Sequence, residues 1–229
     1  MTSKLPPNFV GGQAFKNVDL WKKLMDENAS KGVVTPPMLR YMIEKGGLNI
    51  LHRGLLDPNS ELTFNGRKFP DLSSLQASRP AGLNYQSFSG KPKAEVQEIL
   101  SDLLLKKVVR KLTPREVNLA TFSPLGYAEK PQLHEPPKKR LTFHWLRNSQ
   151  YRRSPVNLAS IAENGDALSH VKEGYIVDLK SYYWQLPLDY ESSLSCGFAV
   201  NDGQGGIEYY CFQVLPFGCR FMGGKICDL

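Results

Sequence analysis

One segment of this 229-residue chain repeats apolar residues at helical spacing. Between residues 94 and 112 they fall at i, i+3, i+4, i+7, i+8 and i+12, at Val96, Ile99, Leu100, Leu103, Leu104 and Val108. This spacing predicts one continuous apolar helix face. The last turns of this helix would carry four basic residues, Lys106, Lys107, Arg110 and Lys111. We expect them to compensate the helix dipole rather than bind nucleic acid.

Beyond residue 120 the pattern changes to that of β-strands. Residues 121 to 130 form one candidate strand, and Leu141, Phe143 and Trp145 alternate in a second, across a proline-rich turn. Residues 196 to 200 and 207 to 214 flank a loop of Asn, Asp and Gly, which is typical of a hairpin. Helices followed by strands, without strict alternation, predict an α+β fold.

The first half of the chain is less regular. Residues 1 to 50 predict two short helices: Asn17 would cap the first, Thr35 would cap the second, and Gly46 and Gly47 would end it. Residues 51 to 93 are rich in Pro, Gly, Asn and Ser, which indicates a linker with one short hairpin. We therefore predict an N-terminal extension over 1–93 and a second unit over 94–229.

The composition is that of an ordinary globular protein, with 41% hydrophobic and 22% charged residues. The formal net charge is +7, which fits either a solvated basic surface or affinity for a polyanion such as nucleic acid. The four cysteines and four histidines lack metal-binding spacing, so we expect packed free thiols. Without an apolar signal core or a membrane-spanning stretch, we expect an intracellular protein, cytoplasmic or nuclear, that is not secreted and has no membrane partner.

One constellation points to chemistry. Residues 175 to 188 read YIVDLKSYYWQLPL, so a short apolar strand delivers Asp178 at its end, before a turn full of aromatic residues. A carboxylate between apolar walls must be solvated, paired or bound to a cation, and Mg²⁺ prefers such oxygen ligands. An Asp that simply caps the next turn is the ordinary alternative.

Further motifs accompany this strand in a fixed order. Residues 122 to 130 read FSPLGYAEK, residues 138 to 143 read KKRLTF, and residues 214 to 220 read VLPFGCR. Together they resemble the fingers and palm of retroelement reverse transcriptases, in particular retrotransposon enzymes of the Ty3/gypsy and DIRS type. The resemblance spans roughly residues 94 to 222. It implies the fingers and an incomplete palm of a right-hand polymerase.

The resemblance also implies roles for individual residues around the metal. Asp178 would bind the two Mg²⁺ ions of a phosphoryl transfer, and the carbonyl of Leu179 would help to hold one of them. The partners would be an RNA or DNA template with its primer, and deoxynucleoside triphosphates. Arg220 would contact the template–primer duplex.

The nucleotide would meet a second group of residues. Arg140, with Lys139 or Lys138, would contact the triphosphate, because a planar guanidinium matches phosphate oxygens. Tyr183 stands at the position of a steric gate that excludes a 2′-hydroxyl. Phe217 and Gly218 would lie against the new base pair, where glycine allows close backbone approach.

The chain departs from the family's pattern where a second metal-binding element is expected. The family has an aromatic-x-Asp-Asp hairpin beyond L-P-F-G, and these 229 residues contain no Asp-Asp pair. One carboxylate cannot hold two Mg²⁺ ions beside a triphosphate, so we expect this chain alone to be inactive. Two alternatives stay open: a non-catalytic basic module that binds nucleic acid or another partner, and a basic globular protein whose motif matches are coincidental.

Overall fold

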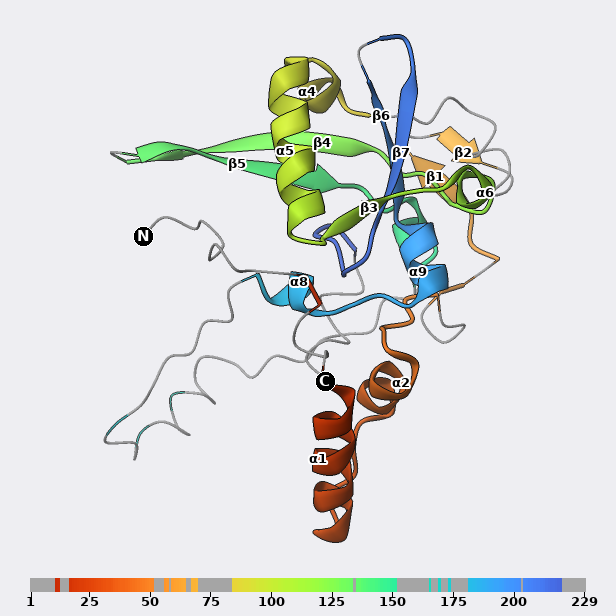
Figure 1. Cartoon of the computed structure of the whole chain (residues 1–229), viewed down its shortest axis with the longest axis vertical. Helices are drawn as coiled ribbons and strands as arrows, with labels where there is room; N and C mark the ends of the chain where they lie inside the picture. Colours follow the sequence, from red (N-terminus) through yellow and green to blue (C-terminus); the bar gives the residue numbers. More distant parts are fainter. Residues whose placement is uncertain are drawn as a thin grey trace.

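The computed structural model describes residues 11–12, 17–51, 56–57, 59–64, 67–69, 84–133, 135–151, 165, 169, 173, 181–202 and 204–219. Figure 1 shows their elements in chain order. The helices are α1 (Val18–Ser30), α2 (Pro37–Lys45), α4 (Gln86–Ser89), α5 (Lys93–Leu105), α6 (Pro114–Val117), η3 (Leu146–Ser149), α8 (Tyr182–Gln185) and α9 (Tyr190–Ser195). The strands are β1 (Leu62–Phe64), β2 (Arg67–Phe69), β3 (Val109–Lys111), β4 (Leu125–Gln132), β5 (Glu135–Phe143), β6 (Gly197–Asn201) and β7 (Ile207–Phe212).

The core is built around a small antiparallel sheet of order β3–β7–β6. Val109 of β3 stands opposite Phe212 of β7, and Phe198 of β6 stands opposite Tyr210 of β7. Buried residues of α5, β4 and β5 join the same apolar cluster. With two further two-stranded sheets, β1–β2 and β4–β5, the molecule has the mixed α+β architecture that the sequence predicts.

The strands predicted at 121–130, 141–145, 196–200 and 207–214 are present with shifted ends, whereas the strand predicted before Asp178 lies outside the described residues. The loop between β6 and β7 is a hairpin connection in which the Asp202 carboxylate accepts hydrogen bonds from the backbone N–H groups of Gln204 and Gly206. The predicted proline-rich turn is wrong in position, because Pro131, Pro136 and Pro137 lie within β4 and β5. A two-stranded ribbon tolerates proline because each strand has a free edge.

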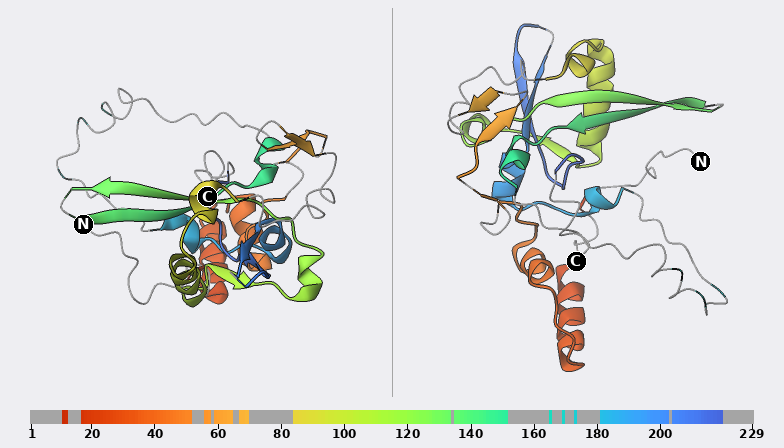
Figure 2. Two further views of the ribbon diagram at one scale, coloured as in Figure 1. Left: turned by 90° about the horizontal axis from the view of Figure 1, so that it is seen from above. Right: turned by 180° about the vertical axis from the view of Figure 1, so that it is seen from behind.

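The β4–β5 hairpin is the most extended feature of the molecule. Its base lies beside α5, and its far end projects away from the other described elements in all three views (Figures 1 and 2). We call this hairpin the arm.

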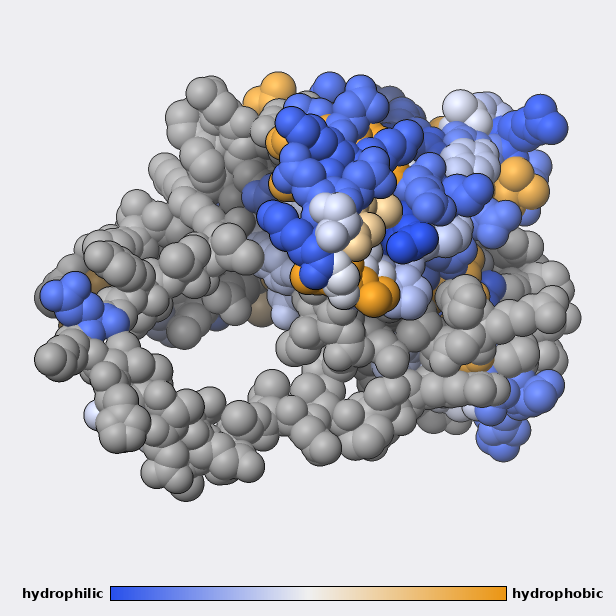
Figure 3. Space-filling model, turned by 90° about the horizontal axis from the view of Figure 1, so that it is seen from below, coloured by the Kyte–Doolittle hydropathy of each residue, from blue (hydrophilic) through white to orange (hydrophobic). Residues whose placement is uncertain are grey.

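The N-terminal helices α1 and α2 lie towards the lower end of the molecule in Figure 1. Asn17 caps α1 as predicted, since its side chain accepts a hydrogen bond from the Leu20 N–H. Thr35 does not cap α2, which instead begins after Pro36 with Pro37 in its first turn. Gly46 ends α2 in the left-handed conformation (φ 73°), as the Gly-Gly pair predicted. Seen from this end, the described surface is mostly hydrophilic with scattered apolar side chains (Figure 3).

The predicted 94–112 helix is too long. Helix α5 ends at Leu105, and Lys107 adopts a left-handed backbone conformation (φ 54°) that turns the chain into β3. Arg110 and Lys111 therefore do not compensate a helix dipole. Arg110 forms an ion pair with Glu116 on α6, and Lys111 pairs with Glu208 on β7.

The segment predicted as a linker contains the expected hairpin, β1–β2. It also contains α4, which the sequence did not predict. The residues around α4 are bonded to the arm: the Tyr85 N–H donates to the Leu125 carbonyl, and the Leu125 N–H donates to the Asn84 side chain. The end of this segment thus belongs structurally with β4.

Two further predictions concern the cysteines and the absence of a membrane-spanning stretch. Cys196, Cys211 and Cys219 are buried free thiols, as expected. Among the helices that the structure describes, none combines the length and the apolar character needed to cross a membrane.

Candidate functional site

Tyr183 and Phe217, which come from two separate sequence motifs, meet in the structure. Tyr183 lies on α8 and Phe217 on the turn after β7, and their rings meet edge to face with centroids 5.3 Å apart. The Trp184 ring also contacts Phe217, at 5.4 Å between centroids. Tyr183, Trp184 and Phe217 form what we call the aromatic cluster. Phe217 remains 40% exposed, so the cluster offers an aromatic surface to solvent.

Gly218, the next residue, packs its backbone directly against the end of β5. Its φ of 111° lies in the range that side-chain-bearing residues rarely adopt. A Cβ at this position would overlap the carbonyl group of Phe143 at the end of β5. The Asn148 side chain donates a hydrogen bond to the Gly218 carbonyl at 2.6 Å. The turn that carries Phe217 is therefore held against β5 and η3 in one conformation.

The arm carries charged residues on both of its strands. Glu129 stands opposite Lys139, and Ala128 stands opposite Arg140, with Lys130 and Lys138 as the next pair. Residues that stand opposite each other share one face of a hairpin, so Glu129 and Lys139 lie together. We call the face with Glu129 and Lys139 the inner face.

The inner face is attached to α5 and to the turn before it by ion pairs. Lys139 Nζ lies 2.7 Å from the Glu95 carboxylate, and Lys91 Nζ lies 2.8 Å from Glu129. The Tyr127 hydroxyl also donates to Glu95, at 2.9 Å. The hydrogen bond from Lys139 is the main reason that the pKa of Glu95 is lowered. Lys139 is thus already paired with an acid.

Three predicted site residues cannot be placed. Asp178, Leu179 and Arg220 lie outside the described residues. In the described part of the chain, no group of three or more His, Cys, Asp or Glu side chains could hold a metal ion. The prediction that Asp178 and Leu179 bind Mg²⁺ therefore stays a prediction.

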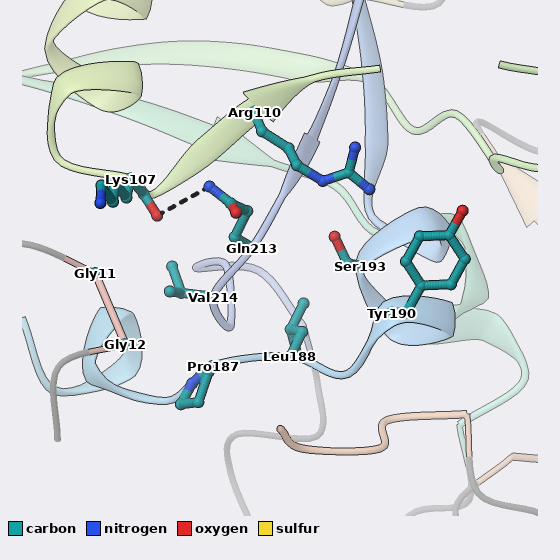
Figure 4. Close-up of a pocket in the computed structure, with 10 residues that line it drawn as sticks. All are labelled: Gly11, Gly12, Lys107, Arg110, Pro187, Leu188, Tyr190, Ser193, Gln213 and Val214. Carbon is teal, nitrogen blue, oxygen red and sulfur yellow. Dashed lines mark hydrogen bonds between the residues drawn. The ribbon is translucent and has the colours of Figure 1, made fainter. Parts of the chain in front are cut away.

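A cavity of about 330 Å³ lies between the turn after α5, the end of β7 and α9 (Figure 4). Three of its polar lining residues are engaged in internal bonds. Arg110 pairs with Glu116, the Ser193 hydroxyl donates to the Phe212 carbonyl, and the Gln213 amide donates to the Lys107 carbonyl. No described member of the predicted site lines this cavity, so it is separate from the aromatic cluster.

Sequence reasoning missed two residues that shape the site. Asn148, which bonds the Gly218 carbonyl, lies outside the four quoted motifs, so the motif comparison did not point to it. Glu95 lies in the first turn of α5 and joins this helix to Lys139 and Tyr127. No local signal identifies either residue, since both act on partners distant in the chain.

Comparisons with known proteins assign no family to this chain. No protein-family model matches this chain, and no curated protein matches it.

Proposed function

We propose that this chain is a fragment of an RNA-directed DNA polymerase, comprising the fingers and an incomplete palm. In the complete enzyme these parts would extend a primer with deoxynucleotides. The contact between Tyr183 and Phe217 carries the proposal, because it joins two of the four motifs on which the resemblance depends. A partly exposed aromatic ring such as that of Phe217 is suited to pack against a sugar or a base.

The arm supports the same function. Its strands contain Lys130, Lys138 and Arg140 at neighbouring register positions, and basic residues of this kind suit contact with phosphates. The arm is attached to α5 and to the turn before it by the ion pairs of Glu95 and Glu129, so its backbone has a defined position. Arg140 is the better candidate for a phosphate contact than Lys139, which Glu95 already neutralises.

Mg²⁺ would supply charge stabilisation at the transferred phosphate when bound. Asp178 is the residue proposed to hold it, with the Leu179 carbonyl. The absence of an Asp-Asp pair from the sequence argues that this chain alone does not catalyse the reaction. The same absence, with the net charge of +7, favours a second candidate function: a non-catalytic module that binds nucleic acid.

The test compares the chain with a version extended after Leu229 by a hairpin that carries aromatic-x-Asp-Asp. We expect the extended version to add complementary deoxynucleotides to a primer on an RNA template in the presence of Mg²⁺. Asp178→Ala should abolish this incorporation, because it removes the first metal-binding carboxylate. Asp26→Ala, an exposed carboxylate on α1, is the matched control and should leave incorporation unchanged.

Two outcomes would contradict the polymerase proposal. One is undiminished incorporation by the Asp178→Ala variant. The other is failure of the extended version to incorporate any nucleotide, while the chain binds the duplex in a salt-dependent manner that ignores Mg²⁺ and nucleotide. The second result would favour the non-catalytic module.

A further inference from the structure

Two glycines near the N-terminus connect elements that are distant in the sequence. Gly11 and Gly12 pass between the turn after α5 and helix α8 (Figure 4). The Gly11 N–H donates to the Lys106 carbonyl at 2.6 Å, and the Gly12 N–H donates to the Trp184 carbonyl at 2.8 Å. Both carbonyls belong to the C-terminal ends of helices, where backbone oxygens lack partners within the helix. The dipeptide therefore satisfies two helix ends at once.

Each position excludes a side chain for its own reason. A Cβ on Gly11 would lie 3.0 Å from the Lys107 carbonyl oxygen and 3.0 Å from the Val214 side chain. Gly12 has a φ of 70°, which costs a residue with a side chain much more than it costs glycine. Only glycine fits both positions without displacing its neighbours.

Helix α8 depends on such contacts for its position. It has four residues, and its N-cap, Ser181, makes no side-chain cap bond. A single helical turn has little stability of its own. Besides the bond from Gly12, the end of α8 is attached through the Leu186 carbonyl, which accepts from the Leu215 N–H at 2.9 Å. Both bonds hold the C-terminal end of the helix that carries Tyr183 and Trp184.

We propose that Gly11 and Gly12 form an intramolecular clip that positions α8, and with it the Tyr183 and Trp184 rings against Phe217. The bond from Gly12 holds the C-terminal end of α8 on the side of α5. The bond from Leu215 holds it on the side of the turn after β7. Gly11 and Gly12 are positioning residues, since Gly11 bonds the backbone at the end of α5 and Gly12 bonds the backbone of α8. The clip's effect on a nucleotide rests on the proposed function, but its effect on the rings does not.

The experiment follows the three tryptophans by ¹⁹F NMR of protein labelled with fluorotryptophan, together with amide hydrogen exchange. In Gly11→Val and Gly12→Ala, we expect the Trp184 resonance to shift or broaden while those of Trp21 and Trp145 stay in place. Exchange of the Trp184 and Leu186 amides should accelerate on the order of tenfold, as for loss of about 1.4 kcal/mol of local stability.

Gly205→Ala is the matched control. Gly205 also has a positive φ, 89°, and open space around its Cβ position, but it lies in the β6–β7 loop. The variant introduces the same kind of backbone strain without touching α8, so the Trp184 resonance should not move. Gly12→Asn tests a residue that tolerates the left-handed conformation, and its Trp184 exchange should lie between those of the wild type and Gly12→Ala.

An unchanged Trp184 resonance in both Gly11→Val and Gly12→Ala would overturn the clip. Equal changes at all three tryptophans would also overturn it, because they would indicate a general loss of structure. If Gly12→Ala does not fold, Gly12→Asn supplies the same comparison. A failed clip leaves the Asp178→Ala experiment unaffected, and a failed polymerase proposal leaves the Trp184 result unaffected.

Discussion

Helices α1 and α5 have the same length, 13 residues, but only α5 contributes buried residues to the core. Helix α1 has a side-chain cap at Asn17 but contains no buried residue. Helix α5 has no side-chain cap bond but buries Val96, Leu100 and Leu103 in the core. Helix α1 thus has the stronger N-cap, and helix α5 is the one packed against the core.

This difference indicates which helix supports the candidate site. A cap stabilises its own helix by about 1 kcal/mol, whereas burying a leucine contributes about 2–5 kcal/mol to the whole fold. Because α5 is packed in the core, its Glu95 can position the arm and its end can receive the clip. Helix α1 can fray without disturbing either feature.

The largest effect is expected from truncating a buried leucine side chain to alanine. Leu100→Ala on α5 should lower the free energy of unfolding by about 3 kcal/mol, because it leaves a cavity at a position that is 5% exposed. Leu24→Ala on α1, at a position that is 39% exposed, should change it by less than about 0.5 kcal/mol. Urea denaturation of both variants measures the difference. Similar losses in the two variants would break the comparison.

An intermediate effect is expected at α6, where capping and an ion pair act together. The Glu116 carboxylate accepts two hydrogen bonds from Arg110, at 2.8 and 2.9 Å, and a third from the Thr113 N–H. The bond to Arg110 is the largest cause that lowers the pKa of Glu116 to about 2. Glu116→Gln should lower the free energy of unfolding at pH 7 by about 2 kcal/mol, as for a hydrogen bond to a charged group.

The lowered pKa of Glu116 predicts how its contribution to stability changes with pH. Since the folded pKa lies below the unfolded value of 4.5, the carboxylate stabilises the fold fully above pH 4.5. This stabilisation is lost as the pH falls towards 2, so the wild type and Glu116→Gln should converge there. Glu98→Gln, at an exposed position on α5, is the control and should change stability little at any pH. A difference that is independent of pH would contradict the ion-pair explanation.

The smallest effect is expected at the cap of α1. Asn17→Ala removes the acceptor for the Leu20 N–H and should destabilise α1 locally by about 1 kcal/mol. Faster amide exchange within α1, with an unchanged urea midpoint, would show that the helix frays alone. Ser30→Ala, at the other end of α1, removes one exposed hydroxyl and should have a weaker effect. A fall in the urea midpoint for Asn17→Ala would mean that α1 supports the core after all.

Local patterns predicted most element types and failed at particular boundaries. The apolar spacing of α5 continues through Val108, so periodicity alone carried the helix past its true end at Leu105. Val108 is buried, but in the turn that Lys107 makes with its positive φ. The T-x-x-E capping box of Thr113 and Glu116 was present in the sequence and would have identified α6. Helix α4 gave no such signal, because its bonds run to β4.

The sequence by itself determined the α+β class, the start of α1, the β6–β7 hairpin and the order of the motifs, because these depend on residues close together in the chain. The tertiary structure alone decided that Tyr183 meets Phe217, that Lys139 pairs with Glu95, and that Gly11 and Gly12 reach the ends of α5 and α8. Contacts of this kind depend on strand register and on the packing of distant segments. No local periodicity or capping motif contains that information.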